Sequence, residues 1–231
     1  MFKGLIPSPA LVKPSFLMIA LLSTSTITGC ATETHRTIQP QTVATYKTAY
    51  QSQQVSVAIG KFQNSSSYLN GLFASGNDKL GSQGKTILKT HLQQTGRFKL
   101  VDRENMNELK QEANFSGSKQ SISGAHFVVT GSVTEFGRKE VGDRQFFGIL
   151  GSGKRQIAYS KVSINVVDVV TSQVVYSTQG AGEYELSNRE IVGFGGTAGY
   201  DATLNGKVMN LSITEAVNNL TRDLDLGVWG K

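Results

Sequence analysis

The sequence predicts an α+β fold in which a small α/β domain carries two long β-hairpins. Strand and helix patterns alternate between residues 54 and 132, which is the order of an α/β domain. Residues 133–207 show no helical period, and their many glycines are typical of turns between strands. All four prolines of the 231-residue chain lie at or before Pro40, so the later strands run without the residue that interrupts sheets.

The first 29 residues have the layout of an export signal. Two lysines precede a short apolar run at residues 16–22, which is far below the ~20 residues of a membrane helix. Residues 27–30 then read Ile-Thr-Gly-Cys and resemble the bacterial lipobox, whose cysteine receives a lipid. We therefore predict a lipoprotein signal peptide at residues 1–29 and lipid attachment at Cys30. The alternative is that Cys30 is a small buried apolar residue.

The residue after the cysteine is Ala31, not the aspartate that retains lipoproteins at the inner membrane. By resemblance to sorted lipoproteins, we expect a lipid-anchored protein of the outer membrane that faces the periplasm. The lipidated cysteine and the polar residues up to 53 form a predicted tether (residues 30–53), because this stretch has no hydrophobic period.

The predicted α/β domain occupies residues 54–132. Its expected elements are a strand at 55–59, a loop at 63–81, a helix at 82–94, a strand at 98–101, a helix at 103–113 and a strand at 126–133. We expect Asp102 to cap the second helix and Met106 and Leu109 to face inward. Residues 114–124 are an expected Ser/Gly linker.

Residues 133–207 are predicted to form the two hairpins, with turns at 151–153, 171–173 and 193–199. Arms of about 17 residues would reach ~56 Å, and an isolated hairpin of that length is not stable in water. We expect the hairpins to lie on another surface or to pair with copies of themselves. Residues 208–231 contain a closing helix that packs on the α/β domain through one apolar face: Leu211, Ile213, Val217, Leu220 and Leu224.

The sequence predicts no catalytic residue, no metal site and no cofactor apart from the lipid. Cys30 is the single cysteine, and the three histidines (His35, His91 and His126) fit no catalytic or metal-binding motif. Residues 81–86 (GSQGKT) resemble a phosphate loop, but position 79 is lysine where that motif needs glycine, so a glycine-rich helix start is favoured. Without its signal the chain has 21 basic and 17 acidic residues and no basic run, so we expect no nucleic-acid partner.

The ordered set of lipobox, tether, α/β domain and paired hairpins resembles the CsgG/HfaB family, the curli-type secretion-channel lipoproteins. The best local match is Phe146, Phe147, Gly148 and Ile149 at the tip of the first hairpin, followed by the polar arm at residues 162–177. The step from strand to helix at residues 100–103 and the strand at 128–133 also fit. The resemblance covers most of residues 50–225.

The resemblance implies a homo-oligomeric ring whose hairpins join a shared transmembrane β-barrel, through which unfolded protein subunits cross the outer membrane. It implies secreted or surface-structure subunits and accessory lipoproteins as partners. In the family, the loop after the first strand narrows the pore with a tyrosine, an asparagine and a phenylalanine. Leu72, Phe73 and Asn77 are the candidates here, and within residues 71–77 Phe73 and Asn77 match the family's residue types.

The hairpins also carry charges, such as Arg138 and Glu183, that are costly on a lipid-facing surface. The alternative function is therefore a non-pore envelope lipoprotein of the same family, acting in the assembly of a surface structure or in cell-wall synthesis.

Overall fold

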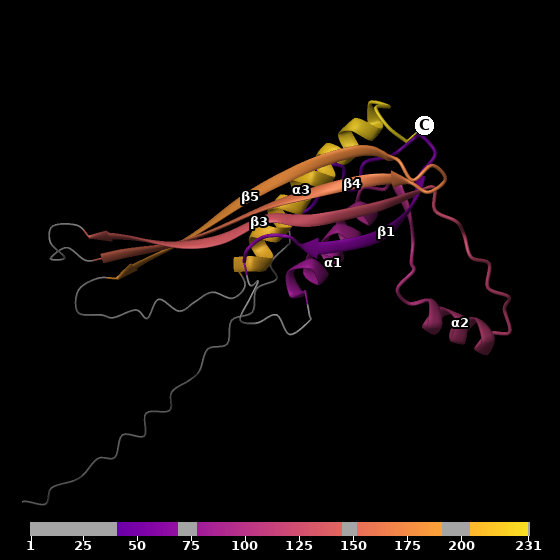
Figure 1. The fold of residues 1–231 in the computed structure, drawn as a ribbon, viewed down its shortest axis with the longest axis horizontal. Coiled ribbons are helices and arrows are strands. Elements are labelled where there is room, and N and C mark those ends of the chain that lie inside the picture. Colours follow the sequence, from indigo (N-terminus) through magenta and orange to yellow (C-terminus); the bar gives the residue numbers. More distant parts are fainter. Residues whose placement is uncertain (1–40, 69–77, 145–151, 191–203, 231) are drawn as a thin grey trace, which may run out of the picture. The chain divides into compact units, whose positions relative to one another are not determined.

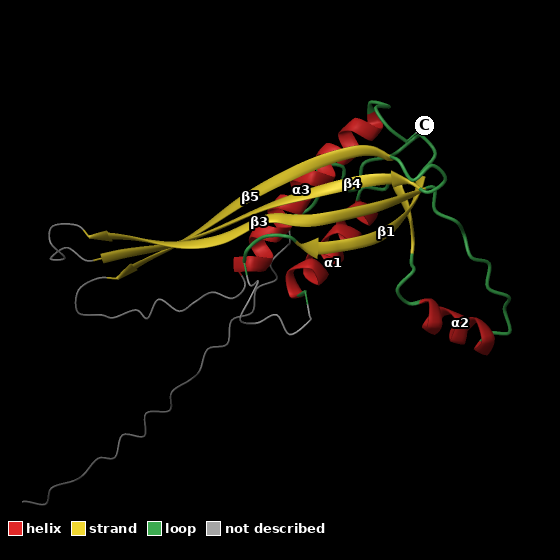
Figure 2. Ribbon diagram, in the orientation of Figure 1, coloured by secondary structure: helices red, strands yellow, loops and turns green. Residues whose placement is uncertain are grey.

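The computed structural model describes residues 41–68, 78–144, 152–190 and 204–230. Figures 1 and 2 show the elements in chain order: β1 (Val55–Asn64), α1 (Lys79–Gln94), β2 (Phe98–Val101), α2 (Met106–Phe115), β3 (Phe127–Arg144), β4 (Ser152–Asp168), β5 (Val174–Glu190) and α3 (Leu204–Asp225). The fold is a mixed α/β fold with a five-stranded sheet and three helices in the described residues. This confirms the predicted fold class at that level.

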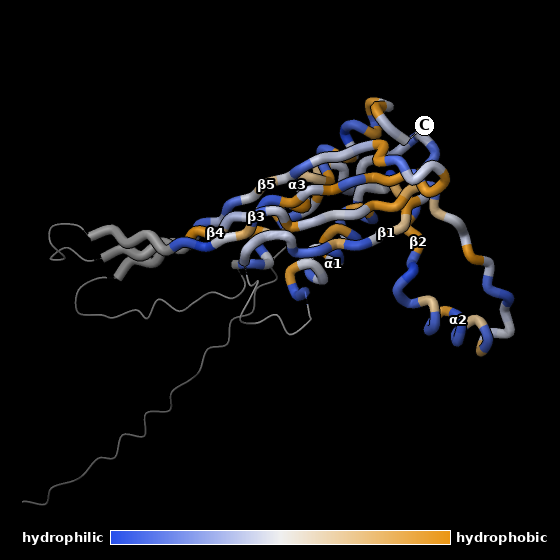
Figure 3. The backbone as a smooth tube through the Cα atoms, viewed as in Figure 1, coloured by the Kyte–Doolittle hydropathy of each residue, from blue (hydrophilic) through white to orange (hydrophobic). Residues whose placement is uncertain are grey.

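The strand order in the sheet is β2-β1-β3-β4-β5. β1 pairs in parallel with both β2 and β3, and β3, β4 and β5 form an antiparallel meander. The helices α1 and α3 pack on one face of the sheet. Alternate residues of β4 are therefore buried: Val162, Ile164 and Val166 face the helices, while Ser163 and Asn165 are partly exposed. In Figure 3 the hydrophobic stretches of the tube follow the strands of this packed region.

Two glycines of β5 allow α3 to lie directly on the edge strand. A β-carbon at Gly180 would lie 2.1 Å from the Ser212 carbonyl oxygen, and one at Gly182 would lie 2.9 Å from the Ser212 nitrogen. α3 buries Ile213, Val217, Leu220 and Leu224 against the sheet, as its apolar period predicts. Leu211 is only partly buried, and the helix begins at Leu204 rather than at residue 208.

The phosphate-loop-like stretch is a helix start at which α1 touches β1. Asp78 caps α1 by accepting a hydrogen bond from the Gly81 nitrogen at 2.7 Å. A β-carbon at Gly84 would lie 2.4 Å from the ring of Phe62. The glycines therefore serve close packing of helix on strand.

The helix predicted at residues 103–113 forms at 106–115, but the prediction that Met106 and Leu109 face inward is wrong. No residue of α2 is buried, and Leu109 is 43% exposed. Asp102 does not cap this helix. Its carboxylate accepts hydrogen bonds from the Glu104 and Asn105 backbone nitrogens and forms an ion pair with Lys89 of α1. Asp102 therefore connects the end of β2 to α1.

The described residues contain three long strands where two complete hairpins are predicted. β3 and β4 form the first hairpin, paired from Phe127 with Asp168 to Arg144 with Ser152. The predicted turn at 171–173 is confirmed, with Ser172 at a φ of 58° and the Asp168 carboxylate accepting hydrogen bonds from the Val170 and Thr171 backbone nitrogens. Residues 152 and 153, expected in the first turn, belong to β4, and the third turn lies outside the described residues.

A cluster of aromatic rings closes the end of the sheet near the C-terminus. The ring of Trp229 lies 6.1 Å from that of Phe98, 5.9 Å from that of Phe127 and 5.7 Å from that of Tyr176. Its indole nitrogen donates a hydrogen bond to the Leu220 carbonyl oxygen at 3.1 Å. Residues from β2, β3, β5 and the segment after α3 therefore meet at one side chain.

Candidate functional site

The hairpin region is a strand ladder that continues beyond β1. The pairing of β1 with β3 ends at Asn64 and Val133, whereas β3 remains paired with β4 as far as Arg144 and β4 with β5 as far as Glu190. Among the described residues, the outer edge of β3 from Thr134 onward and the outer edge of β5 have no partner strand. Unpaired edges of this length are normally covered or paired, because their free N–H and C=O groups attract other strands.

The first part of this ladder carries charge on the face away from the helices. Lys161 and Glu135 form an ion pair at 3.3 Å across β4 and β3, and Lys139 follows on the same side of β3. Tyr159 lies across Gly137, whose β-carbon would be 2.4 Å from the tyrosine ring. On the helix face, Phe136 is buried and its ring lies 4.7 Å from that of Tyr68.

The described part of the predicted tether is docked on α3 instead of running free. Val43 is buried in the core, the Ala44 nitrogen donates to the Asn218 side-chain oxygen at 2.8 Å, and the Asn210 amide donates to the Gln41 carbonyl oxygen at 3.4 Å. We call residues 41–50 the strap. The buried Arg97 guanidinium holds its far end by donating to the Thr48 carbonyl and hydroxyl oxygens.

Arg97 also pairs with Asp225 near the end of α3, at 3.3 Å. The strap lacks a hydrophobic period because one buried valine and a few hydrogen bonds fix it. For this reason the sequence alone predicts a free tether at these residues.

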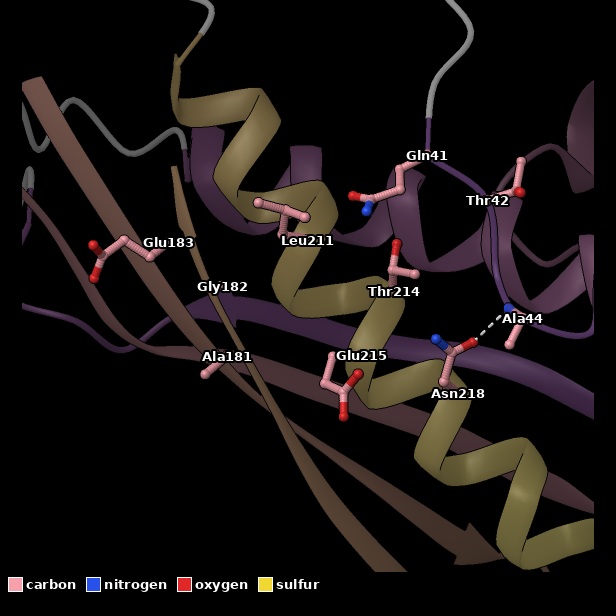
Figure 4. Close-up of a pocket in the computed structure, with 10 residues that line it drawn as sticks. All are labelled: Gln41, Thr42, Ala44, Ala181, Gly182, Glu183, Leu211, Thr214, Glu215 and Asn218. Carbon is pink, nitrogen blue, oxygen red and sulfur yellow. Dashed lines mark hydrogen bonds between the residues drawn. The ribbon is translucent and has the colours of Figure 1, made fainter. Parts of the chain in front are cut away.

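A groove lies where the strap, α3 and the free edge of β5 meet (Figure 4). It encloses about 340 Å³, and we call it the edge groove. Its lining comes from three separate parts of the chain: Gln41, Thr42 and Ala44 of the strap, Ala181, Gly182 and Glu183 of β5, and Leu211, Thr214, Glu215 and Asn218 of α3.

One carboxylate, that of Glu215, gives the edge groove its charge, because the Glu183 side chain leaves the face of β5 opposite to Gly180 and Gly182 and points away from α3 (Figure 4). Glu183 and Glu215 have no hydrogen-bond or ion-pair partner among the described residues. Other charged side chains of α3 do have a partner: Arg222 pairs with Asp223, and Lys207 lies over the ring of Tyr184.

A tyrosine–aspartate pair joins β5 to α3. The hydrogen bond from Tyr176 lowers the pKa of Asp223. Burial, together with the Asp223 carboxylate as acceptor, raises the pKa of Tyr176 to about 12.

His91 lies behind the groove in a polar cluster between α1 and α3. It is buried, and its Nε2 lies 2.8 Å from the Asn210 side-chain oxygen and 3.1 Å from the Thr214 hydroxyl. Because Asn210 also donates to Gln41, the cluster joins α1, α3 and the strap. His126 precedes β3; its backbone nitrogen donates to the Ser56 carbonyl oxygen, and its carbonyl oxygen accepts from the Val169 nitrogen. In the described ranges no group of three or more His, Cys, Asp or Glu residues is placed to hold a metal ion.

The lipid site and the candidate pore residues fall outside the described residues. These are Cys30, the loop residues Leu72, Phe73 and Asn77, and the tip residues Phe146, Phe147, Gly148 and Ile149. Among the helices that are described, none has the length and hydrophobicity to cross a membrane. The edge groove was not predicted, because its lining comes from three separate segments that become neighbours only in the fold.

Comparison with known families defines the class of the protein. The family model described as "Curli production assembly/transport component CsgG" matches residues 39–231. The chain therefore belongs to the CsgG family, as the resemblance implies.

A relative from Neisseria meningitidis serogroup B (strain ATCC BAA-335 / MC58) bears the name "Putative lipoprotein NMB1126/NMB1164". It is 59% identical over 203 residues, which cover 88% of this chain and 91% of the relative. The chain is accordingly a CsgG-family lipoprotein.

Two solved structures overlap with this chain at low identity. The PelC dodecamer from Paraburkholderia phytofirmans is 13% identical, with 78% of this chain and 93% of that chain covered and a TM-score of 0.34. The lipoprotein GNA1162 from Neisseria meningitidis is 12% identical, with 73% and 99% covered and a TM-score of 0.35.

Proposed function

We propose that this CsgG-family lipoprotein forms a homo-oligomeric ring in which the hairpins of neighbouring copies join into a shared transmembrane β-barrel. The barrel would let unfolded protein subunits pass through the outer membrane. The observation that carries the proposal is the ladder of β3, β4 and β5, which continues past β1 with two edges that have no partner strand among the described residues. Pairing edge to edge around a ring removes both edges, and a closed barrel is the only sheet that a bilayer accommodates.

Lipid on Cys30 would hold the chain at the membrane, since two or more acyl chains on one residue give stable anchoring. The loop between β1 and α1 would narrow the passage through Leu72, Phe73 and Asn77, and Phe146 to Ile149 would form the hairpin tip. Transport through such a pore is passive passage, so the proposal includes no catalytic residue and no cofactor.

A second candidate function is a non-pore envelope lipoprotein of the same family, and the charge of the ladder favours it. Lys139 is followed by residues 140–144 in the described part of β3, so the strand that continues past this charge is short. A tilted strand needs about 9–11 residues to cross a bilayer. A charge exposed to lipid at the bilayer midplane costs about 2–4 kcal/mol for Arg or Lys, so the part up to Lys139 fits water better than lipid.

Single-channel conductance in planar bilayers tests the pore. The purified, lipidated oligomer is expected to conduct, and Phe73→Ala is expected to raise the conductance because it removes an aromatic ring from the narrowest point. Phe115→Ala is the matched control, since Phe115 is an exposed aromatic residue on α2. A ring that never conducts would exclude the channel and favour the second function, and equal conductance of the two variants would contradict the role of Phe73.

A further inference from the structure

The two flanks of the sheet carry opposite charge. Within their bounds, β1, α1 and β2 contain five lysines and no acidic residue. On the other flank, β5 and α3 contain six acidic and three basic residues. A ring brings one flank of each copy against the opposite flank of the next, which is a heterologous contact. Opposite signs on those flanks favour this orientation over contacts between like flanks.

Two of the five lysines on this flank are already neutralised within the chain. Lys85 pairs with Glu104, and Lys89 pairs with Asp102 at 3.0 Å. Lys79, the first residue of α1, is exposed and has no partner among the described residues. On the acidic flank, the unpartnered Glu215 lines the edge groove. The lysine-bearing flank therefore keeps three free lysines, Lys61, Lys79 and Lys99, and the groove on the other flank holds the free carboxylate of Glu215.

The register of the sheet places Lys79 at the height of the groove. The Asp78 carboxylate accepts from the Asn64 nitrogen at 2.7 Å, and Asn64 is level with Val133, Val162 and finally Gly180 across the sheet. The groove residues 181–183 lie one to three positions further along β5, about 3–10 Å. When copies are related by rotation about an axis that runs along the strands, each residue keeps its position along that axis. Lys79 of the next copy would therefore lie level with the groove and face it.

Lys99 provides a natural contrast at the other end of the same flank. It is exposed and without a partner among the described residues, but it pairs in register with Ser56, at the start of β1. Ser56 lies near the level of the turn between β4 and β5, because the next residue, Val57, is level with Phe127 and Asp168. Lys99 is therefore about 26–33 Å along the strands from the groove.

We infer that the edge groove is an intersubunit site that receives Lys79 of the neighbouring copy. The apolar stem of the lysine would lie along Leu211, and its ammonium would donate to the Glu215 carboxylate. This inference rests on the proposed ring and names the contact that joins its copies outside the strand ladder. The strap forms one wall of the site, so the neighbour's lysine would also contact the segment that leads to the lipid anchor.

Crosslinking of the full lipidated chain in detergent tests the contact directly. A short bismaleimide added to the Lys79→Cys and Glu215→Cys double variant is expected to give a ladder of covalent oligomers up to the full ring. The Lys99→Cys and Glu215→Cys double variant is the matched control and is expected to remain monomeric on a denaturing gel. Rings that form normally but crosslink only through Lys99→Cys, or through neither pair, would overturn this inference and leave the proposed ring intact.

Charge reversal gives a second measurement that does not depend on crosslinking geometry. Glu215→Lys is expected to raise the concentration at which rings dissociate about tenfold or more, and added Lys79→Glu is expected to reverse most of that loss. Adding Lys99→Glu instead should not restore ring assembly. Equal rescue by both lysine variants would overturn the specific contact. Absence of any oligomer in the parent chain would instead remove the proposed ring, and this inference with it.

Discussion

Replacing Gly180 by alanine is expected to lift α3 from the edge of the sheet. The new β-carbon would stand 2.1 Å from the Ser212 carbonyl oxygen and 2.4 Å from the Ala216 nitrogen. Both are backbone atoms of α3, so no side-chain rotation relieves the clash. The helix or the strand must move by about an ångström or more to restore normal contact distances.

The cost of that movement follows from what α3 buries. Met209, Ile213, Val217 and Leu220 are fully buried beneath the helix, so a shift opens their packing along its length. Inserted methyl groups in packed cores cost about 1–3 kcal/mol, and a clash with backbone belongs at the upper end. At about 2–4 °C per kcal/mol for a domain of this size, ~3 kcal/mol lowers Tm by about 6–12 °C.

Urea and thermal unfolding followed by far-UV circular dichroism measure this effect. Gly124→Ala is the control, because nothing lies within 4 Å of its added β-carbon and it should stay within about 0.5 kcal/mol of the parent. If Gly180→Ala matched that control, the packing of α3 against β5 would be refuted. The proposed wall of the edge groove would then be wrong as well.

Three further outcomes are expected. Arg97→Met should lower the free energy of unfolding by about 2–3 kcal/mol and speed proteolysis of residues 41–50, because the strap loses its buried hydrogen bonds; unchanged cleavage would contradict the docked strap. The Lys89 ammonium lowers the pKa of Asp102, so the folded state is stabilised above the unfolded pKa of about 4 and loses this contribution as the pH falls below it; urea midpoints between pH 6 and pH 2 should therefore drop less in Asp102→Asn than in the parent, and parallel curves would be the opposing result. Cys30→Ser should release the protein from the membrane fraction of cells, and unchanged fractionation would refute the lipid site.

Hydrophobic periodicity predicted the parts of the fold in which a repeated pattern meets the core. The strand at 98–101 is β2 to the residue, and the alternation of Val162, Ile164 and Val166 is the buried face of β4. The same reasoning failed for α2, whose Met106 and Leu109 have helical spacing but no surface to bury against. Spacing reports the shape of an element and does not report whether anything covers it.

The candidate site was less predictable for a physical reason. Gln41, Gly182 and Asn218 belong to three segments that share no local motif, and each has an ordinary local sequence. Their proximity depends on α3 lying on the edge strand, which in turn depends on Gly180. The glycine content of residues 133–207 predicted turns, whereas Gly180 and Gly182 lie inside a strand and serve contact with a helix.

Trp229 is the single tryptophan of the chain, and it stands where β2, β3, β5 and the segment after α3 converge. Its indole fluorescence is therefore a native reporter of one place in the molecule, with no label needed. Separation of α3 from the sheet would expose the buried ring to water and shift its emission to longer wavelength. Changes confined to the strand ladder would leave that emission unaltered, so one spectrum distinguishes opening of the α/β domain from rearrangement of the hairpins.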